Sequence, residues 1–276
     1  MHLSGLFIYP VKGLRGFSVN SADVDALGLV GDRRFLVVDE TGRFLTQRTL
    51  PRMALIATAL DATHLTLSTE GADRARVALT SDPAAGRHTV SIWKSDGLQT
   101  EDCGDEVATF LSTFLATRCR LVRIGPAFRR PVLKSAARAG DVFHFGDGAP
   151  LLVISEASIA DLNDRLVEQG KAAVPMDRFR PNLVVSGCTA FAEDTWPRFR
   201  LGTAIFRAAG QSSRCIVTTT DQFTGKRGTE PLRTLATYRR DATDPTDVNF
   251  GQNLINETKS GTVRVGDAVE LSTSMP

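Results

Sequence analysis

The chain has 276 residues and a mass of 29.8 kDa, with 42% hydrophobic and 23% charged residues. This balance is typical of a folded globular protein and excludes wholesale disorder, and the length suits one large domain or two small ones. The 33 basic and 31 acidic residues give a net charge of +2, which excludes the strongly basic surface of a general nucleic-acid coat. We therefore expect no nucleic-acid partner.

Neither a signal peptide nor a membrane span is expected. The first residues lack a basic leader, and Tyr9-Pro10 ends their apolar run early. No apolar run approaches the roughly 18–20 residues of a membrane helix. The chain has no CxxC pair, which argues for free thiols in a reducing compartment. The four cysteines are Cys103, Cys119, Cys188 and Cys215. We expect a cytoplasmic protein with no membrane partner.

Short β-strands are predicted over about the first 100 residues. Alternating or β-rich apolar residues mark them at 6–8, 17–24, 34–38, 43–46, 53–60, 64–69, 77–79 and 90–93. A glycine-bearing turn at 39–42 predicts that the third and fourth of these pair as a hairpin. Short strands at this spacing favour a barrel or sandwich over βαβ units.

A helix follows the predicted strands, because apolar residues at 107, 110, 111, 114 and 115 form one helical stripe. Asp105 or Gly104 is its expected N-cap. A strand is expected at 121–124, and residues 125–140, which are rich in basic residues and contain two prolines, form a loop. We place a domain boundary near residue 120, giving domains at 1–120 and 121–276.

The second half mixes strands with two helices. Ser155 is expected to cap a helix that ends near Gly170, and Thr229 to cap another that has Pro231 in its first turn. Strands are expected at 182–185, 204–208 and 215–220, and a hairpin at 262–271. The predicted fold class is mainly β (α+β), with two β-barrel-like domains and a few peripheral helices.

Widespread catalytic motifs are absent: the sequence contains no GxGxxG, GxxxxGK[ST], GxSxG or HExxH. The four histidines are isolated from one another and are expected to be neither metal ligands nor catalytic bases. They are His2, His64, His88 and His144.

Cys215 allows two interpretations. A buried structural thiol is the ordinary role of a free cysteine. However, the neighbouring Arg214 can lower a thiol pKa and so favour a metal-binding or nucleophilic thiolate. The hydroxyl-rich flank at 212–220 could also bind an oxyanion or a polar ligand.

Three basic clusters are candidate anion-binding groups. They are Lys12, the pair Arg33 and Arg34, and the pair Arg178 and Arg180. The planar fork of arginine suits bidentate binding of phosphate or carboxylate. Each cluster taken alone is more often a solvated or structural charge. Their meaning depends on whether they converge, which spacing does not show.

Several segments, in their order along the chain, resemble one family of domains. The first group is Tyr9–Gly13, Gly31–Phe35 and Leu45–Arg48, and the second is Ser155–Ser158, Phe179–Asn182, Ser213–Cys215 and Phe250–Asn253. The first group resembles the N-terminal β-barrel domain, and the second the MOSC domain, of the MOSC family, named after the C-terminal part of molybdenum cofactor sulfurase. The likeness spans nearly the whole chain and is greatest to the mitochondrial amidoxime-reducing component and its bacterial relatives.

The resemblance implies a molybdenum cofactor, in which a pyranopterin dithiolene holds the metal. Cys215 matches the cysteine that ligates molybdenum, and a soft thiolate suits such a metal. The residues that match cofactor-binding or pocket-lining positions, or flank the metal ligand, are Lys12, Gly13, Arg33, Asp147, Arg180, Asn182, Ser213 and Arg214. Two positions depart from some relatives: Gly13 replaces a serine, so that a backbone contact would replace a side-chain one, and Ala149 replaces a hydroxyl residue.

The expected function is that of an enzyme, a molybdenum-dependent oxidoreductase that reduces small N-hydroxylated compounds such as amidoximes, hydroxylamines and N-hydroxylated bases. Asp221 is a candidate catalytic proton-handling residue, with a turn or strand-end role as the alternative. The sequence has no C-x4-C-x2-C pattern for an iron–sulfur cluster, so a separate ferredoxin-like protein or flavin reductase is expected to supply electrons. The alternatives are a carrier that delivers the cofactor, or a persulfide on Cys215, without reductase turnover, and a binding module with a degenerate pocket.

Overall fold

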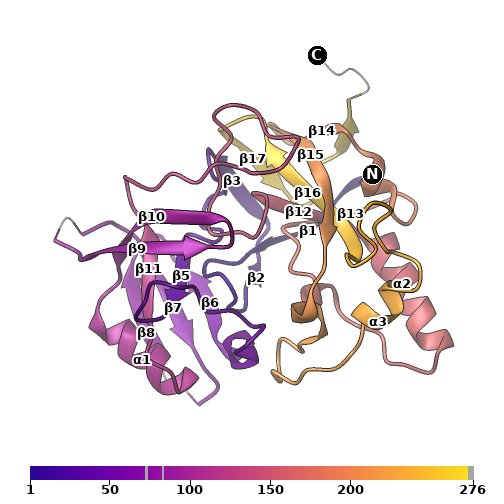
Figure 1. The fold of residues 1–276 in the computed structure, drawn as a ribbon. Helices are drawn as coiled ribbons and strands as arrows, with labels where there is room; N and C mark the ends of the chain where they lie inside the picture. Colours follow the sequence, from indigo (N-terminus) through magenta and orange to yellow (C-terminus); the bar gives the residue numbers. More distant parts are fainter. Residues whose placement is uncertain (72–73, 83, 273–276) are drawn as a thin grey trace.

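The computed structural model of the chain describes residues 1–71, 74–82 and 84–272 (Figure 1). The strands are β1 (His2–Ile8), β2 (Phe17–Ser18), β3 (Ser21–Asp25), β4 (Gly28–Leu29), β5 (Phe35–Val38), β6 (Ala57–Leu60), β7 (His64–Ser68), β8 (Arg74–Ala78), β9 (Arg87–Ile92), β10 (Ser95–Asp102), β11 (Arg120–Ile124), β12 (Leu151–Ser155), β13 (Leu183–Ser186), β14 (Arg198–Leu201), β15 (Ala204–Ser213), β16 (Asn249–Asn256), β17 (Gly261–Arg264) and β18 (Val269–Leu271). The α-helices are α1 (Asp105–Leu115), α2 (Glu156–Glu168) and α3 (Leu232–Leu235), and short 3₁₀ turns lie at Pro51–Leu55, Met176–Arg178, Ala192–Thr195 and Ile216–Thr219.

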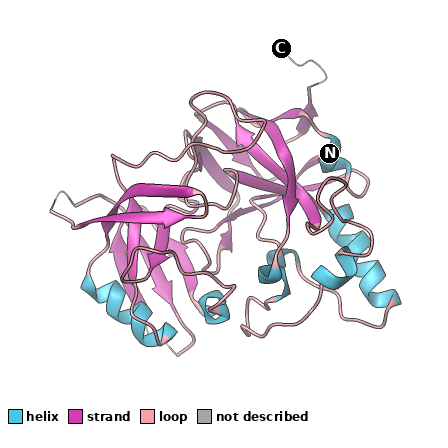
Figure 2. Ribbon diagram, viewed as in Figure 1, coloured by secondary structure: helices cyan, strands magenta, loops and turns pink. Residues whose placement is uncertain are grey.

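Two groups of sheets lie side by side, as Figures 1 and 2 show. The larger group is built on an eight-stranded sheet of order β18-β14-β15-β16-β12-β13-β1-β2. The other group holds a four-stranded sheet of order β5-β11-β10-β9 and a three-stranded sheet of order β6-β7-β8. A further small sheet joins β17, β3 and β4. This arrangement confirms the mainly β fold class, with few helices and strongly curled sheets.

The chain crosses between the two groups more than once. Strand β1 pairs with β13, Leu6 opposite Leu183, so the first residues complete the sheet of the second half. Strand β11 pairs with both β5 and β10 and so lies in the first group. The domain boundary near residue 120 stays a prediction. No helix within the described ranges has the length and apolar character needed to cross a membrane.

The two longer predicted helices are confirmed. Each packs its apolar face against a hydrophobic core. Helix α1 places Val107 and Leu111 in a core cluster with β7 and β8, and Gly104 is its N-cap. Helix α2 begins after Ser155, whose hydroxyl oxygen accepts a hydrogen bond from the Ser158 amide at 3.0 Å. This helix crosses over between β12 and β13, which pair in parallel.

Several predicted strands and caps are wrong, each for a local reason. Residues 215–220 form no strand: the Thr218 and Thr219 hydroxyls donate to carbonyls three residues back and stabilise a 3₁₀ turn. Residues 53–56 also belong to no strand, because Pro51 begins a 3₁₀ turn there. Helix α3 has only four residues, with Pro231 rather than Thr229 at its N-cap.

Of the two predicted hairpins, the C-terminal one is wrong and the one at 34–46 forms only in part. At the C-terminal one, the Arg264–Asp267 turn forms, but β17 pairs with β3 and β18 with β14. The buried Val263 and Val269 belong to the same hydrophobic cluster, although their strands pair in different sheets. At 34–46 the turn forms and an antiparallel Val38–Phe44 bridge follows it, with the Leu45 amide donating to the Val37 carbonyl at 2.8 Å; beyond Leu45 the chain leaves the sheet toward a pocket.

Candidate functional site

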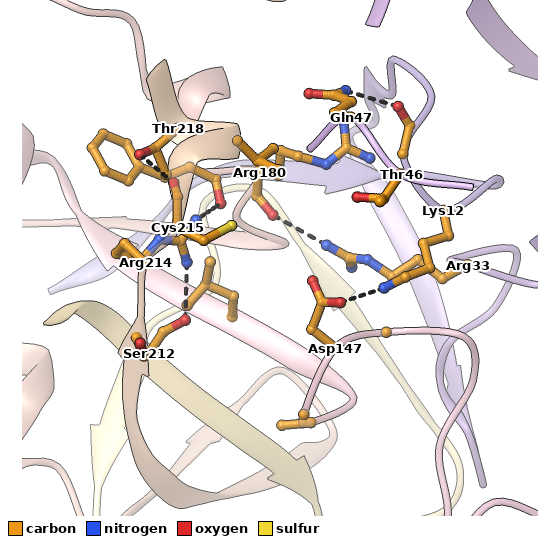
Figure 3. A pocket seen from close by; sticks show the side chains of 18 of the residues that line it. Lys12, Arg33, Thr46, Gln47, Asp147, Arg180, Ser212, Arg214, Cys215 and Thr218 are labelled. Atoms are coloured by element: carbon orange, nitrogen blue, oxygen red, sulfur yellow. Dashed lines mark hydrogen bonds and ion pairs between the residues drawn. The ribbon is translucent and has the colours of Figure 1, made fainter. Parts of the chain in front are cut away.

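A pocket opens between the two groups of sheets, and it collects nearly all of the residues singled out from the sequence (Figure 3). Its empty volume is about 950 Å³, a figure that includes space open to solvent. The first half of the chain lends Lys12, Gly13, Arg33, Trp93 and residues 45–48. The second half lends Asp147, Arg180, Asn182 and the run 212–215. The three basic clusters therefore do converge, through Lys12, Arg33 and Arg180.

Cys215 lies where β15 ends and the Ile216–Thr219 turn begins. The thiol is free and the residue is half-buried. Its carbonyl accepts hydrogen bonds from both the amide and the hydroxyl of Thr218, each at 3.0 Å, which fixes the local backbone. Figure 3 shows the sulfur turned toward the gap that Asp147 and Arg180 face. A thiol held in this way is available to a ligand in the pocket.

Arg214 brings a positive charge next to that thiol. Its guanidinium donates to Ser212 Oγ at 2.9 Å and to the Phe179 carbonyl at 2.7 Å, and its Nε is buried without a partner. Burial lowers the pKa of Arg214 to about 10, so the group is still charged at neutral pH. A neighbouring cation stabilises a thiolate, which is the form that binds metals.

Lys12 and Asp147 form an ion pair across the pocket, one residue from each half of the chain. Burial lowers the pKa of the Lys12 ammonium, while the carboxylate of Asp147 opposes that shift. Although the side chain of Asp147 is 75% exposed, the Lys12 ammonium and the Trp93 indole, which donates to Oδ1 at 2.8 Å, hold the pKa of Asp147 well below its usual range. Asp147 is thus ionised and fixed by two donors.

Arg33 and Arg180 stack on the same ring. Their guanidinium carbons lie 4.9 and 4.4 Å from the centroid of Tyr9. Arg33 also donates to the carboxylate of Asp32, to Asn182 Oδ1 at 2.9 Å and to the Arg180 carbonyl at 3.2 Å. Both arginines have positive φ, 47° and 56°, a strained region for such residues that is typical of functional sites.

Asn182 is fully buried beneath these arginines. Besides accepting from Arg33, its Oδ1 accepts from the Leu152 amide at 3.3 Å and its Nδ2 donates to the Phe7 carbonyl at 3.2 Å. The side chain therefore joins β1 and β12 and orients Arg33. Gly13, with φ of +82°, offers its carbonyl to Gln47 Nε2 at 2.7 Å. A side chain at position 13 would be strained by this backbone conformation.

The lining is strongly positive. Its cationic side chains are Lys12, Arg33, Arg48, Arg180 and Arg214, and Asp147 is the one carboxylate among the described residues that line it. Nowhere in the described ranges do three or more His, Cys, Asp or Glu side chains gather as a metal site. The arrangement suits an anionic ligand that meets a single thiolate.

Asp221 is not brought to this pocket. Its Oδ1 accepts from the Phe223 and Thr224 amides at 3.0 and 2.8 Å, and its Oδ2 accepts from Arg178 at 2.9 Å. Burial alone would raise the pKa of Asp221, but these donors lower it. Asp221 closes a turn and is ionised, and the geometry favours the structural alternative.

Sequence reasoning gave no role to four residues of the site. Trp93 and Arg48 lie at the pocket, 4.5 Å apart as a cation–π pair, and Arg130 and His144 lie buried behind the turn that carries Asp147. Trp93 lies in a two-residue turn, because Ile92 pairs with Ser95 in the structure. Its bulk gave no sign of a turn in the sequence. Arg130 lies in a segment that reads as a loop, and His144 is isolated in the sequence.

Comparison with known proteins agrees with the geometry. Residues 1–118 match the MOSC N-terminal beta barrel domain and residues 140–270 match the MOSC domain. The chain is 37% identical to mitochondrial amidoxime-reducing component 1 of Mus musculus over 282 residues, which cover 96% of this chain and 81% of the relative. It is also 37% identical to the same component of Homo sapiens over 284 residues, with the same coverage of both chains. It is 34% identical to the molybdenum cofactor sulfurase of Oryza sativa subsp. japonica over 257 residues, which cover 87% of this chain but 31% of that protein. The chain belongs to the MOSC family.

Proposed function

We propose that this protein binds a molybdenum cofactor in the pocket and uses it to reduce small N-hydroxylated compounds, with electrons from a separate protein. The observation that carries the proposal is the position of Cys215, the one thiol among the described lining residues, in a pocket lined by five cationic side chains. The amidoxime-reducing components to which the chain is 37% identical support the reductase activity.

The residues present fit such a group. A soft thiolate is a suitable ligand for molybdenum, and Arg214 favours the thiolate form of Cys215. Lys12, Arg33 and Arg180 would hold the anionic phosphate and the pterin, with Asn182 keeping Arg33 in place. The unpartnered Nε of Arg214 shows that hydrogen-bonding capacity remains unused beside the thiol. Gly13, Ser213 and Asp147 complete the lining.

When bound, the cofactor would supply the two-electron removal of oxygen from an N–OH group, which with two protons gives an amine or amidine and water. The protein's own part is to bind and orient. Arg214 places a cation beside Cys215, and Ser213 lends a hydroxyl to the lining for a polar substrate. Trp93 and Asp147 form part of the pocket's lip, since both side chains are partly exposed there. Asp221 is given no catalytic part, because its carboxylate is saturated by its own turn.

The electrons would come from outside the chain. The sequence has no nucleotide-binding fingerprint and no cysteine pattern for an iron–sulfur cluster. A ferredoxin-like protein or a flavin reductase is the proposed donor. Its docking would bring a redox centre to the solvent-open side of the pocket.

A second candidate function is supported by the sulfurase of Oryza sativa, which matches 87% of this chain. A cofactor carrier, or a carrier of a persulfide on Cys215, would use the same thiol and the same cationic lining. Reductase turnover separates the two functions, since a carrier would bind the cofactor and yet reduce no N-hydroxylated compound.

The test is reduction of an amidoxime by cofactor-loaded protein with a chemically reduced viologen as electron donor. We expect amidine to form with the wild type, and none with Cys215→Ala. Amidine formation at the wild-type rate by Cys215→Ala would refute the proposal. The carrier function would be favoured if the cofactor-loaded wild type formed no amidine and oxidised the viologen no faster than the background rate.

A further inference from the structure

The turn that carries Asp147 has little regular structure of its own. Residues 146–150 run between the end of the basic loop and β12, and four of them, Gly146 to Ala149, line the pocket. A backbone segment without strand or helix partners needs other groups to satisfy its amides and carbonyls. Here two buried side chains from outside the pocket lining provide them, His144 and Arg130.

Both ring nitrogens of His144 bond to this turn. The Gly146 amide donates to Nδ1 at 2.9 Å, so Nδ1 carries no proton. Nε2 lies 2.8 Å from the Pro150 carbonyl and therefore carries the proton and donates it. The imidazole is fully buried, and it spans the turn from its first residue to its last. Gly146 is needed for this approach, since a Cβ there would lie 2.8 Å from His144 Cε1.

Arg130 holds the same turn from a second direction. Its NH1 donates to the carbonyls of His144 and Gly146 at 3.0 and 2.6 Å, and its Nε donates to Ser95 Oγ at 3.1 Å. The residue is 2% exposed, and its guanidinium carbon lies 4.2 Å from the ring centroid of Phe143. A buried arginine that donates to the carbonyls of His144 and Gly146, just before and at the start of the turn, fixes where residue 147 lies.

His144 also touches the opposite wall of the pocket. Its Nε2 is 3.1 Å from Asp32 Oδ2, the oxygen that accepts from Arg33, and Asp32 Oδ1 accepts from the Tyr9 amide at 2.8 Å. The imidazole therefore lies between the Asp147 turn and the buried carboxylate that orients Arg33. Movement of the ring would disturb both walls.

We propose that His144 and Arg130 are positioning residues that hold the Gly146–Pro150 turn, so that Asp147 meets Lys12 and the cofactor pocket keeps its shape before any ligand arrives. The value of such positions lies in preorganisation: a site held in place loses less entropy when its ligand binds. The role of this turn in cofactor binding rests on the proposed function. The positioning itself is testable in the protein without cofactor.

The test compares His144→Phe, which removes both hydrogen bonds, with His144→Asn, whose side-chain oxygen can replace Nδ1 as the acceptor. Leu111→Ala is the control, since it removes core volume under α1, a helix that contributes none of the described residues that line the pocket. Two rates are measured on the protein without cofactor: hydrogen exchange at the Gly146 amide, and acylation of the Lys12 amine followed by peptide mass spectrometry.

We expect His144→Phe to raise both rates about three- to tenfold, the factor that corresponds to the loss of one buried hydrogen bond. His144→Asn should restore protection of the Gly146 amide, and Leu111→Ala should leave Lys12 acylation at the wild-type rate. Equal Lys12 acylation in wild type and His144→Phe would overturn the inference, as would ¹⁵N NMR showing the His144 proton on Nδ1. If His144→Phe does not fold, the His144→Asn exchange rate and the wild-type NMR spectrum still decide it.

Molybdenum retention after dialysis separates this inference from the proposed function. If the wild type retains no metal, the proposed function is refuted, but the hydrogen-exchange and acylation rates still test whether His144 positions the turn. Wild type and His144→Phe that retain molybdenum equally well would refute positioning as a contribution to cofactor binding, while the proposed function would stand.

Discussion

The amide side chains of Gln47 and Gln222 exchange two hydrogen bonds, Nε2 to Oε1 at 3.0 Å in one direction and 3.1 Å in the other. Both residues are almost fully buried, and they come from the two different halves of the chain. The remaining amide protons donate to the Gly13 and Thr220 carbonyls. Gln47 lines the pocket, so this pair ties that part of its wall to the second half of the chain.

The Gln47–Gln222 pair is expected to be energetically coupled. Each single change to Met leaves the partner amide buried and unsatisfied, which costs about 1–3 kcal/mol, whereas the double change removes both polar groups together. Urea unfolding of the two single variants and the double variant forms a double-mutant cycle. We expect the double variant to lose less free energy of unfolding than the sum of the two single losses, by at least about 0.5–1 kcal/mol. Strict additivity would show that the amides act independently.

Stability should fall as the pH is lowered, because His144 is buried in its neutral form. Burial lowers the pKa of His144 from 6.5 to about 4, although Asp32 opposes this shift. Between these values the unfolded chain binds a proton that the folded chain does not. The stabilisation present above about pH 6.5 is therefore lost as the pH falls toward about 4, at up to roughly 1.4 kcal/mol per pH unit.

Urea unfolding across this range, with His144→Asn for comparison, measures that contribution. The variant has no titrating ring, so its free energy of unfolding should vary less with pH over the same range. If wild type and variant show the same pH dependence, the protons are taken up elsewhere, and the buried neutral imidazole is not their cause.

Trp93 has an unusual conformation for its size. Its φ is 52° in the turn between β9 and β10, where glycine or asparagine is the usual residue. We expect Trp93→Gly to be more stable than Trp93→Ala by about 1 kcal/mol, the reverse of the usual order, because alanine keeps the strain of the positive φ. Thermal or urea unfolding of the two variants checks this. An alanine variant as stable as the glycine one would mean that the turn relaxes without strain.

Asp221 is expected to matter for stability and not for catalysis. Asp221→Asn keeps an acceptor for the turn amides but weakens the pairing with Arg178 at 2.9 Å, so a loss of about 0.5–1.5 kcal/mol is expected, reduced by the partial exposure of the pair. The rate of amidoxime reduction per bound molybdenum should stay at the wild-type value. A fall of a hundredfold in that rate would return Asp221 to the catalytic residues.

Much of the site was predictable because its residues lie in short, ordered segments. The resemblance of the segments around Lys12, Arg33, Arg180 and Cys215 to one family implied a shared pocket, which their spacing alone did not show, and the structure brings them together. The helices at 105–115 and 156–168 were predictable because an apolar stripe marks the first and the Ser155 N-cap marks the second. Local signals of this kind survive folding when nothing in the tertiary structure competes with them.

The missed features depend on partners that are distant in the sequence. Val263 and Val269 suggest a hairpin, but their strands pair with β3 and β14 in different sheets, which local alternation does not reveal. The 3₁₀ turn after Cys215 forms because threonine hydroxyls bond to the backbone in a β-rich stretch. The importance of His144 follows from contacts with Gly146 and Pro150 that depend on the exact path of the turn.

The most direct test of the proposed function is molybdenum and pterin analysis of protein expressed in a host that makes the cofactor, with Cys215→Ala and Leu111→Ala alongside. The proposal predicts equimolar molybdenum in the wild type and in Leu111→Ala, and its loss from Cys215→Ala. Wild type without molybdenum or pterin, under conditions that load a known relative, would contradict the assignment of the Cys215 pocket as a cofactor site.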